Sequence, residues 1–352
     1  MQVEPDRDAS DALLEQIHQA LENATPLRIQ GSNSKAFLGR EVAGEVLDTR
    51  AHRGIVHYDP TELVITARAG TPLSDVLAAL DACGQMLPCE PPSFGSEATV
   101  GGMIATGLSG PRRPWVGAVR DFVLGTRLIT GSGKVLRLGG EVMKNVAGYD
   151  VSRLLVGSFG CLGVLTEVSL KVLPKPRHCL SISLDLPPAQ ALDTLTEWGQ
   201  QPLPISAAAH DGQRLYVRLE GGEGSVTAAH QRLGGEPLDS AFWAALNEQR
   251  LAFFDEGLPL WRLSLPNNLG PLTLPAEQLI DWAGAQRWLK TDAPDIQSLA
   301  QALGGHATCF TPGASDTPFQ PLAPALLRYH RQLKAQLDPQ GLFNPGRMYA
   351  EL

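Results

Sequence analysis

The alternation of apolar and polar positions divides the first part of the chain into short helices and strands. Apolar side chains recur at helical spacing between Leu13 and Leu21, with Ser10 able to cap the first turn and Pro26 just beyond the last. This pattern predicts an amphipathic helix over 10–23. The apolar run that begins at Pro26 then predicts a strand over 26–30.

Strand patterns continue beyond this helix. The segments 45–48 and 62–69 are rich in residues that favour strands, and the second is followed by Gly70-Thr71-Pro72. A proline at this point predicts the start of a helix, which we place over 73–83. His52 stands beside the turn Arg53-Gly54, so we expect its side chain to be solvated.

A hairpin and a buried strand are predicted within the segment 119–174. The run 119–130 alternates like a strand, and Gly131-Ser132-Gly133-Lys134 turns it into a second strand over 135–138. Asp150 or Ser152 can then cap a short helix that ends at Gly157. After a further glycine turn, an apolar run predicts a buried strand that ends at Pro174.

Glycine is concentrated in the same part of the chain: fifteen of the 36 glycines fall between Gly95 and Gly163. Glycine permits positive φ and lets main-chain N–H groups approach an anion closely. Two interpretations stay open for these loops, a phosphate-binding cradle and a series of tight β-turns. The polar loop from Gly31 to Lys35, which follows the first predicted strand, leaves the same two alternatives.

Beyond Pro174 glycine becomes rarer, and strand patterns alternate with helix patterns. We predict strands over 180–186, 214–219, 260–265 and 285–290, and helices over 189–199, 224–233 and 295–303. This order predicts an antiparallel sheet with helices on one face. A last helix over 323–337 precedes the turn at Asn344. The chain therefore divides into the segments 1–175, 176–310 and 311–352.

Composition limits the class of protein. The 352 residues carry a net charge of -8, which argues against nucleic-acid binding because no basic stripe offsets phosphate repulsion. The five cysteines lack CxxC spacing, so we expect reduced thiols, a cytoplasmic location and no iron-sulfur ligation by this chain. The N-terminal segment does not resemble a signal peptide, and no apolar run reaches the about 20 residues of a membrane span. Any membrane association would come through partners.

Several motifs carry a family resemblance. The glycine run from Thr99 to Gly110, the segment Gly140-Glu141-Val142-Met143-Lys144-Asn145-Val146-Ala147-Gly148-Tyr149-Asp150 and the tail Phe343-Asn344-Pro345-Gly346-Arg347-Met348 resemble the FAD-binding domain of the vanillyl-alcohol oxidase type. The resemblance implies an α+β protein, with a two-lobed FAD-binding domain over 1–175, an α+β cap domain over 176–310 and a tail over 311–352 that returns to the first domain.

The resemblance also implies which residues bind FAD. The polar loop would wrap the pyrophosphate, the run 99–110 would follow the pyrophosphate and ribityl chain, and the turn 160–164 would line the flavin. The residues so implied are Gly31, Ser32, Asn33, Ser34, Lys35, Thr99, Gly101, Gly102, Ala105, Thr106, Ser109, Gly110, Gly160, Gly163, Val164 and Asn344. Because the polar loop contains neither histidine nor cysteine, we expect the FAD to be bound non-covalently.

Within this family, the segment 30–348 is most similar to the FAD-binding subunits of bacterial three-subunit glycolate oxidases. That similarity implies a complex that oxidises glycolate to glyoxylate and passes electrons to an iron-sulfur partner. The expected partners are a larger flavin subunit and an iron-sulfur subunit. The expected location is the cytoplasm, with peripheral attachment to the inner membrane through the complex.

Oxidation of a 2-hydroxy acid needs a cation for the carboxylate and a base for the hydroxyl proton. Guanidinium groups suit the carboxylate, and the basic candidates are Arg112, Arg113, Lys144 and Arg347. A basic residue beside such turns is more often a solvated surface group. His306 and His330 lie where the chain would return from the cap domain, and each suits a structural role better than a catalytic one.

The chain lacks two histidine motifs that occur in related enzymes. Relatives that oxidise 2-hydroxy acids alone carry a His-x-Gly-Asp-Gly-Asn-x-His run and a Gly-Glu-His-Gly segment for metal and substrate. This chain has neither, and it has Gly304-Gly305-His306 in place of the second. We therefore assign no catalytic residue and no metal site, although His306 could preserve part of the role.

Three hypotheses stay open: an FAD-binding subunit of a glycolate-oxidising complex, a self-sufficient FAD-dependent 2-hydroxy-acid dehydrogenase, and an assembly subunit with a vestigial flavin. The missing histidine motifs weigh against the second, and the complete set of glycine loops weighs against the third.

Overall fold

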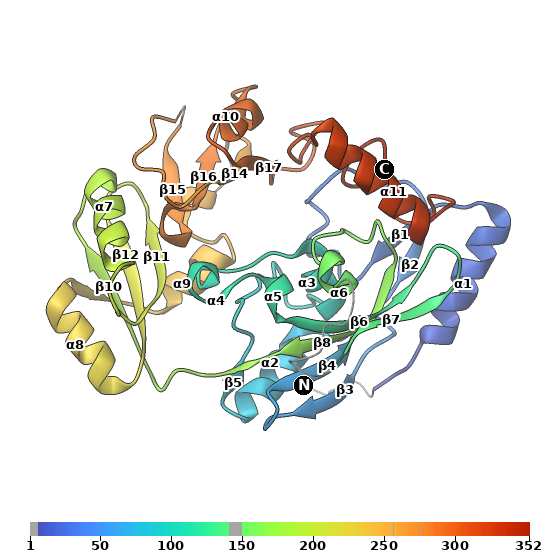
Figure 1. The fold of residues 1–352 in the computed structure, drawn as a ribbon, viewed down its shortest axis with the longest axis horizontal. Coiled ribbons are helices and arrows are strands. Elements are labelled where there is room, and N and C mark those ends of the chain that lie inside the picture. The colour runs from blue at the N-terminus through green and yellow to red at the C-terminus, as the bar shows by residue number, and fades with distance from the viewer. Residues whose placement is uncertain (1–5, 141–149, 256, 275) are drawn as a thin grey trace. The chain divides into compact units, whose positions relative to one another are not determined.

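A computed structural model describes residues 6–140, 150–255, 257–274 and 276–352. The chain forms two compact units (Figure 1). The first combines 1–108, 118–174 and 321–352, and the second combines 109–117 and 175–320. The sequence-based boundary after 175 thus lies one residue from the observed one, whereas the C-terminal boundary falls at 320 rather than 310.

The first unit opens with α1 (Ser10–Asn23), whose Leu13 and Ile17 are buried against a small parallel pair, β1 (Leu27–Gln30) and β2 (Glu45–Asp48). The C-terminal tail joins this pair, because Leu27 donates its N–H to Leu342 and accepts one from Asn344. The predicted return of the tail is therefore confirmed.

A five-stranded antiparallel sheet forms the rest of the first unit's framework, in the order β3-β4-β8-β6-β7. Its central strand β8 is buried along most of its length, as the apolar run predicts. The strands are β3 (Ile55–Asp59), β4 (Val64–Arg68), β6 (Val123–Ile129), β7 (Val135–Gly139) and β8 (Val164–Lys171).

The first unit also contains a minor pair of strands and several helices. The minor pair β5 (Gln85–Met86) and β9 (Leu173–Pro174) is antiparallel. The helices are α2 (Leu73–Ala82), α3 (Val100–Thr106), α5 (Val119–Phe122), α6 (Val151–Leu154) and α11 (Pro324–Leu337). Asp150, one of the two predicted caps, accepts the N–H of Arg153 at the start of α6, and the helix ends at Leu154 rather than at the predicted Gly157.

The predicted strand over 119–130 is wrong at its start, because residues 119–122 form the helix α5. Val119 and Phe122, three positions apart, are both buried on one side of this turn. The Asp121 carboxylate accepts the N–H of Ala118 at 2.7 Å and stabilises the start of the helix. The strand begins only at Val123.

The second unit contains an eight-stranded sheet in the order β13-β10-β12-β11-β15-β16-β14-β17, and all its recorded pairings are antiparallel, as predicted. The strands are β10 (His178–Leu184), β11 (Ile205–His210), β12 (Leu215–Gly221), β13 (Glu236–Leu238), β14 (Leu260–Ser264), β15 (Gln278–Asp281), β16 (Gln286–Lys290) and β17 (His306–Cys309).

Two hydrophobic clusters fill this unit. Helices α7 (Pro188–Trp198) and α8 (Glu223–Leu233) pack on the first, which contains Ile182 and Val217 from the sheet. Helix α10 (Ile296–Ala302) packs on the second, which contains Leu263 and Leu289. The remaining short helices are α4 (Arg113–Val116), α9 (Ala241–Asn247), η1 (Ala252–Phe254) and η2 (Trp282–Gly284).

No helix in the described ranges is both long and apolar enough to span a lipid bilayer.

Candidate cofactor-binding site

Two of the loops implied by the family resemblance, the polar loop and the start of the run 99–110, meet in the first unit together with the segment 93–95. A Cβ on Gly31 would lie 2.4 Å from Oγ1 of Thr99, so the polar loop and the start of α3 touch at this point. A Cβ on Gly95 would lie 3.6 Å from Cβ of Ser34. Lys35 donates from Nζ to the carbonyl of Ser93 at 3.1 Å. Segments more than 60 residues apart in sequence therefore form one surface.

The polar loop presents donors suited to an anion. Asn33 is left-handed, with φ of 61°, and turns the chain so that the main-chain N–H groups of Ser32 and Asn33 have no protein partner within the described ranges. Consecutive N–H groups in such a turn form an anion-binding concavity. Lys35, only 8% exposed, places an ammonium group beside them and within 5.9 Å of the Phe94 ring centroid.

Two neighbouring glycines in α3 serve different purposes. Gly101 donates its N–H to Ala69, and a Cβ there would lie 2.9 Å from the Ala69 Cβ, so this glycine is required for packing. A Cβ on Gly102 would meet only Oγ1 of Thr99, at 3.2 Å. Gly102 therefore borders open space, which is what a glycine beside a ligand would do.

The other predicted residues of α3 make local contacts. Thr99 accepts the N–H of Gly102 at 3.2 Å and so caps the helix. Thr106 donates its hydroxyl to the carbonyl of Gly102 at 2.8 Å. The carbonyl of Ala105 accepts from the N–H of Phe159 at 2.8 Å, which joins α3 to the turn 157–164.

Asn344 connects this turn to β1. Its Oδ1 accepts the N–H of Ile29 at 2.8 Å, and its Nδ2 donates to the carbonyl of Phe159 at 2.7 Å. A Cβ on Gly160 would lie 2.6 Å from this Nδ2, and Gly160 has φ of 72°. Asn344 thus holds the turn, the strand and the C-terminal tail together, a role larger than that of a simple turn residue.

Gly163 and Val164 lie in the hydrophobic interior of the first unit. A Cβ on Gly163 would lie 2.7 Å from Leu128, and the side chain of Val164 is fully buried in the cluster around α1. Any contact that Val164 makes with a ligand must therefore come from its main chain.

Several residues in the loops of this site have strained backbone conformations. Among the described non-glycine residues with positive φ are Asn33 at 61°, Phe94 at 50°, Phe159 at 52° and Asn344 at 42°. Such conformations cost free energy and persist where the surroundings enforce them, and they concentrate at ligand sites.

Ser109 and Gly110 belong to the second unit. The carbonyl of Gly110 accepts from Nε1 of Trp282 at 3.0 Å, so this segment is anchored within that unit. The structure therefore does not group these two residues with the other predicted site residues. The segment 141–149 of the family motif, with the candidate Lys144, lies outside the described residues.

The basic candidates have different surroundings. Arg112 is 7% exposed and forms a two-pronged ion pair with the carboxylate of Glu220, so the expectation of a solvated group is wrong for it. The apolar surroundings require a buried guanidinium to be paired. Arg347 donates to the carbonyls of Arg40 and Ala36, each at 3.0 Å. His330 lies on α11 with Nδ1 2.8 Å from the carbonyl of Leu326.

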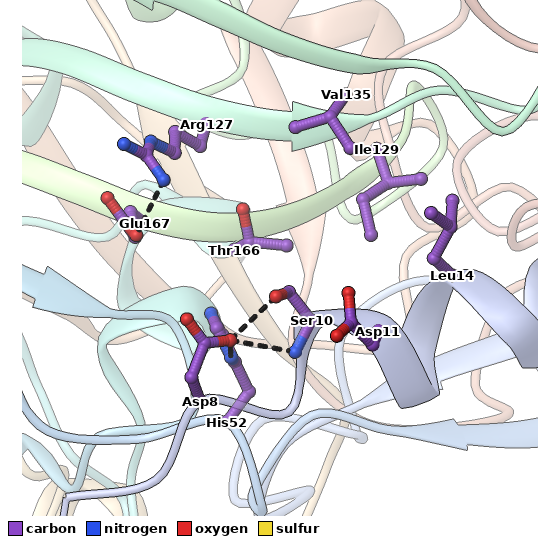
Figure 2. A pocket seen from close by; sticks show the side chains of 10 residues that line it. All are labelled: Asp8, Ser10, Asp11, Leu14, His52, Arg127, Ile129, Val135, Thr166 and Glu167. Atoms are coloured by element: carbon purple, nitrogen blue, oxygen red, sulfur yellow. Dashed lines mark hydrogen bonds and ion pairs between the residues drawn. The ribbon is translucent and has the colours of Figure 1, made fainter.

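A cavity of about 100 Å³ lies elsewhere in the first unit, and sequence reasoning missed it (Figure 2). It is lined by the N-terminal segment and the sheet, at Asp8, Ser10, Asp11, Leu14, His52, Arg127, Ile129, Val135, Thr166 and Glu167. None of the predicted flavin residues lines it.

His52 in this cavity is buried, with 1% exposure, so the prediction that it is solvated is wrong. Its Nδ1 accepts the N–H of Ala9 at 3.1 Å and lies 3.4 Å from the Asp8 carboxylate. Burial lowers the pKa of the imidazole despite this carboxylate. His52 thus fastens the N-terminal segment to the sheet.

Comparison with known proteins agrees with this geometry. Residues 8–139 match the family described as FAD binding domain. A solved structure of alkyldihydroxyacetonephosphate synthase superposes on 97% of this chain and 75% of its own, with a TM-score of 0.68 and 17% identity. The family match and the fold together define a protein with an FAD-binding domain and the fold of that synthase.

Glycolate oxidase subunit GlcE of Escherichia coli (strain K12) is 63% identical over 347 residues, which are 98% of this chain and 99% of that protein. The chain belongs to the GlcE family of glycolate oxidase subunits.

Two further relatives match less than half of this chain. Glycolate oxidase subunit GlcD of Bacillus subtilis (strain 168) is 34% identical over 44% of this chain and 33% of that protein. A D-lactate dehydrogenase of Archaeoglobus fulgidus is 32% identical over 47% of this chain and 39% of its own length.

The residues present fit FAD. Lys35 and the N–H groups of Ser32 and Asn33 supply positive charge and donors for the pyrophosphate, and Gly102 leaves the space beside α3 that a side chain would fill. The first unit alone provides these groups.

Proposed function

We propose that this chain is the FAD-binding subunit of a multi-subunit glycolate oxidase, which oxidises glycolate to glyoxylate and passes electrons to an iron-sulfur partner. The observation that carries the proposal is the 63% identity to the E. coli glycolate oxidase subunit over 98% of the chain. The converging glycine loops support it, because a subunit with a vestigial flavin would not need to keep them.

FAD is held non-covalently in this proposal. The polar loop has no histidine or cysteine, and the cysteine within the turn 157–164, Cys161, is a poor nucleophile. Burial raises the pKa of the Cys161 thiol to about 11, so the reactive thiolate is scarce near neutral pH. The ring of His52 accepts the N–H of Ala9, so it is engaged by the N-terminal segment and is not part of the polar loop.

When bound, FAD supplies an acceptor for the two electrons that leave a hydroxy acid. The chain's own residues bind and orient it. Lys35 with Ser32 and Asn33 holds the pyrophosphate, and Asn344 fixes the turn 157–164 against β1 through its two side-chain hydrogen bonds.

The chain acts as an auxiliary subunit that is active only in the complex. It lacks the histidine motifs that orient a 2-hydroxy acid in self-sufficient relatives, and the described residues contain no group of three side chains able to hold a metal ion. A larger flavin subunit and an iron-sulfur subunit would supply substrate chemistry and the outlet for electrons. We place the complex in the cytoplasm, attached peripherally to the inner membrane through these partners.

The alternative is a self-sufficient FAD-dependent 2-hydroxy-acid dehydrogenase. One observation favours it: the sequence candidates Arg113 and His306 both belong to the second unit, where burial, the charge of Arg262 and the charge of Arg113 lower the pKa of His306.

A reconstitution assay tests the proposal. Glycolate-dependent reduction of a dye is measured with the larger flavin subunit and the iron-sulfur subunit, with and without this chain in its flavin-loaded form. We expect full activity only with all three and little with this chain alone. Full activity without it would contradict the proposal, and rapid turnover by this chain alone would establish the alternative.

A further inference from the structure

Helix α11 buries a lysine rather than an apolar side chain. Lys334 is 8% exposed, and no other residue of this helix, all of which are described, is as deeply buried. Its ammonium group donates to the carboxylate of Asp338 at 2.6 Å, to the carbonyl of Cys161 at 2.7 Å and to the carbonyl of Phe343 at 2.8 Å. An ammonium group has three N–H donors, so every donor is used. A buried charge costs free energy unless it is paired and hydrogen-bonded, and this one meets both conditions.

Asp338 joins the end of the helix to the C-terminal tail. Its side chain is 1% exposed, and besides the ammonium group of Lys334 it accepts the N–H of Leu342 at 3.0 Å and the N–H of Phe343 at 2.8 Å. A Cβ on Gly131, in the turn between β6 and β7, would lie 2.1 Å from Oδ1 of Asp338. The helix, the tail and this hairpin turn therefore enclose the ion pair.

The third hydrogen bond of Lys334 reaches the turn 157–164, in a segment 173 residues earlier in the chain. Side-chain donors hold this turn on both sides of Gly160: Asn344 donates to the carbonyl of the residue before it and Lys334 to the carbonyl of the residue after it, both at 2.7 Å. The N–H of Gly160 itself has no protein partner within the described ranges. The turn thus keeps a main-chain donor at a residue that the family resemblance places beside the flavin, while the flanking carbonyls are occupied.

We propose that Lys334 is a positioning residue for the flavin site, whose ammonium group holds the turn 157–164 in the conformation that receives FAD. A side chain without N–H groups would leave a carboxylate and two carbonyls without this donor, and unsatisfied buried groups cost free energy. Phe159, with φ of 52°, keeps its strained conformation only while its surroundings enforce it. Loss of the ammonium group should therefore release the turn. The inference rests on the proposed function for the identity of the ligand, FAD.

The ion pair also has a local role, because it fastens the end of α11 to the tail. That local role needs only Asp338 and Phe343, whereas the bond to Cys161 joins a different part of the unit. The two roles have different consequences. Loss of a purely local bond lowers the stability of the unit as a whole, whereas loss of a positioning bond opens the turn while the rest of the unit stays closed.

The thiol of Cys161 reports the state of the turn without any flavin. It is 5% exposed, and the exposed thiols of Cys83 and Cys179 can be replaced by serine. Cys89, which is 1% exposed in the same unit, serves as an internal reference because its labelling reports opening of the unit as a whole. Burial raises the pKa of Cys161 and Lys334 lowers it, so loss of the ammonium group by itself would slow labelling. Faster labelling of Cys161 therefore reports opening of the turn.

Maleimide labelling of the full-length, flavin-free chain, mapped by mass spectrometry, tests the proposal. We expect Lys334→Met to raise the labelling rate of Cys161 at least tenfold and to leave the rate of Cys89 unchanged. Arg331→Met, which removes an exposed basic side chain from the same helix, is the matched control and should change neither rate. Fluorescence titration with FAD provides a second measurement: Lys334→Met should weaken binding at least tenfold, and Arg331→Met should not weaken it.

An unchanged rate at Cys161, or an equal acceleration of Cys161 and Cys89, would overturn the proposal, because Lys334 would then serve only the stability of the unit. Unchanged FAD affinity in Lys334→Met would also overturn it. If Lys334→Met does not fold, Lys334→Arg, which keeps the charge but presents its donors in a plane, is measured instead, and the same comparison of Cys161 with Cys89 decides. A wild-type chain that binds no FAD would contradict the proposed function, whereas the labelling rates would still show whether Lys334 holds the turn.

Discussion

Two regions of the first unit each hold a buried lysine, but in different ways. Lys35 donates to a hydroxyl and a main-chain oxygen at the meeting point of the glycine loops, beside two main-chain N–H groups without a protein partner in the described ranges. Lys334 donates to a carboxylate and two carbonyls, which use all three of its N–H groups. The contrast suggests that the first lysine binds the nucleotide, whereas the second positions a turn beside the flavin.

A pair of valine substitutions in α3 separates packing from ligand access in the first unit. Gly102→Val should abolish flavin binding while the chain stays soluble, because the new side chain would enter the open space beside the helix. Gly101→Val should instead destabilise the unit, by about 1–3 kcal/mol as is typical of overpacking, because its Cβ would press on Ala69.

Flavin absorbance and melting temperature together distinguish the two variants. Without flavin, Cys161 should be labelled as slowly in Gly102→Val as in the wild type, because the hydrogen bonds of Lys334 are unchanged. Normal flavin content in that variant would show that the cofactor site lies elsewhere.

Release of the flavin by acid is the next test of the first unit. With no histidine or cysteine between Gly31 and Lys35, acid precipitation should leave all yellow colour in the supernatant. Colour that stays with the pellet would show a covalent bond and would direct attention to Cys161, the cysteine within the turn 157–164.

Lys35→Gln should weaken FAD binding by about 10- to 100-fold, the equivalent of one charge-assisted hydrogen bond of about 1.5–3 kcal/mol. Lys134→Gln, in the exposed hairpin turn of the same unit, is the control and should have no effect. Fluorescence titration with FAD measures both. Faster labelling of Cys161 in Lys35→Gln would show that the two regions are coupled.

The smallest expected effect concerns pH. Because the pKa of His52 is lowered in the folded chain, the unfolded chain binds a proton first as pH falls. Its stabilising contribution is complete above the ordinary histidine pKa of about 6.5 and is lost as pH falls below it, by at most about 1.4 kcal/mol per pH unit.

Asp8, Arg68 and Arg127 also act on the His52 ring, the first opposing and the others reinforcing the shift. Denaturant unfolding between pH 5 and pH 8, compared with His52→Gln, measures the effect. An unchanged pH dependence in that variant would contradict the assignment. Flavin content should not change, since His52 does not belong to the cofactor-binding site.

Sequence reasoning found the glycine loops more readily than the lysine that holds one of them. Glycine and turn residues mark the loops around Gly31, Thr99 and Gly160 locally, and the C-terminal Asn344 belongs to a recognisable tail motif. The structure adds what glycine content cannot give, namely that Gly101 serves packing and Gly102 serves access.

The role of Lys334 has no local signal. In the sequence it is one basic residue of a predicted helix, 173 residues away from Cys161, and the two come together only when the tail folds back on the first unit. Strands such as β11, whose residues are all buried and include three alanines, show no alternation and escaped prediction. The helix α5 was mistaken for strand because its apolar residue Phe122 runs directly into the strand residues Val123 and Leu124, although the three-residue spacing of Val119 and Phe122 fits a helical turn. The contact of Asp121 with Ala118 stabilises the start of that turn.

The anaerobic visible spectrum of the isolated, flavin-loaded chain shows whether its flavin accepts electrons from glycolate without partner subunits. If the chain is an auxiliary subunit, adding glycolate should leave its flavin absorbance unchanged over the period in which the complete complex is bleached. Rapid bleaching of the isolated chain would contradict the account, and it would return His306, His330 and Arg347 to the list of catalytic candidates.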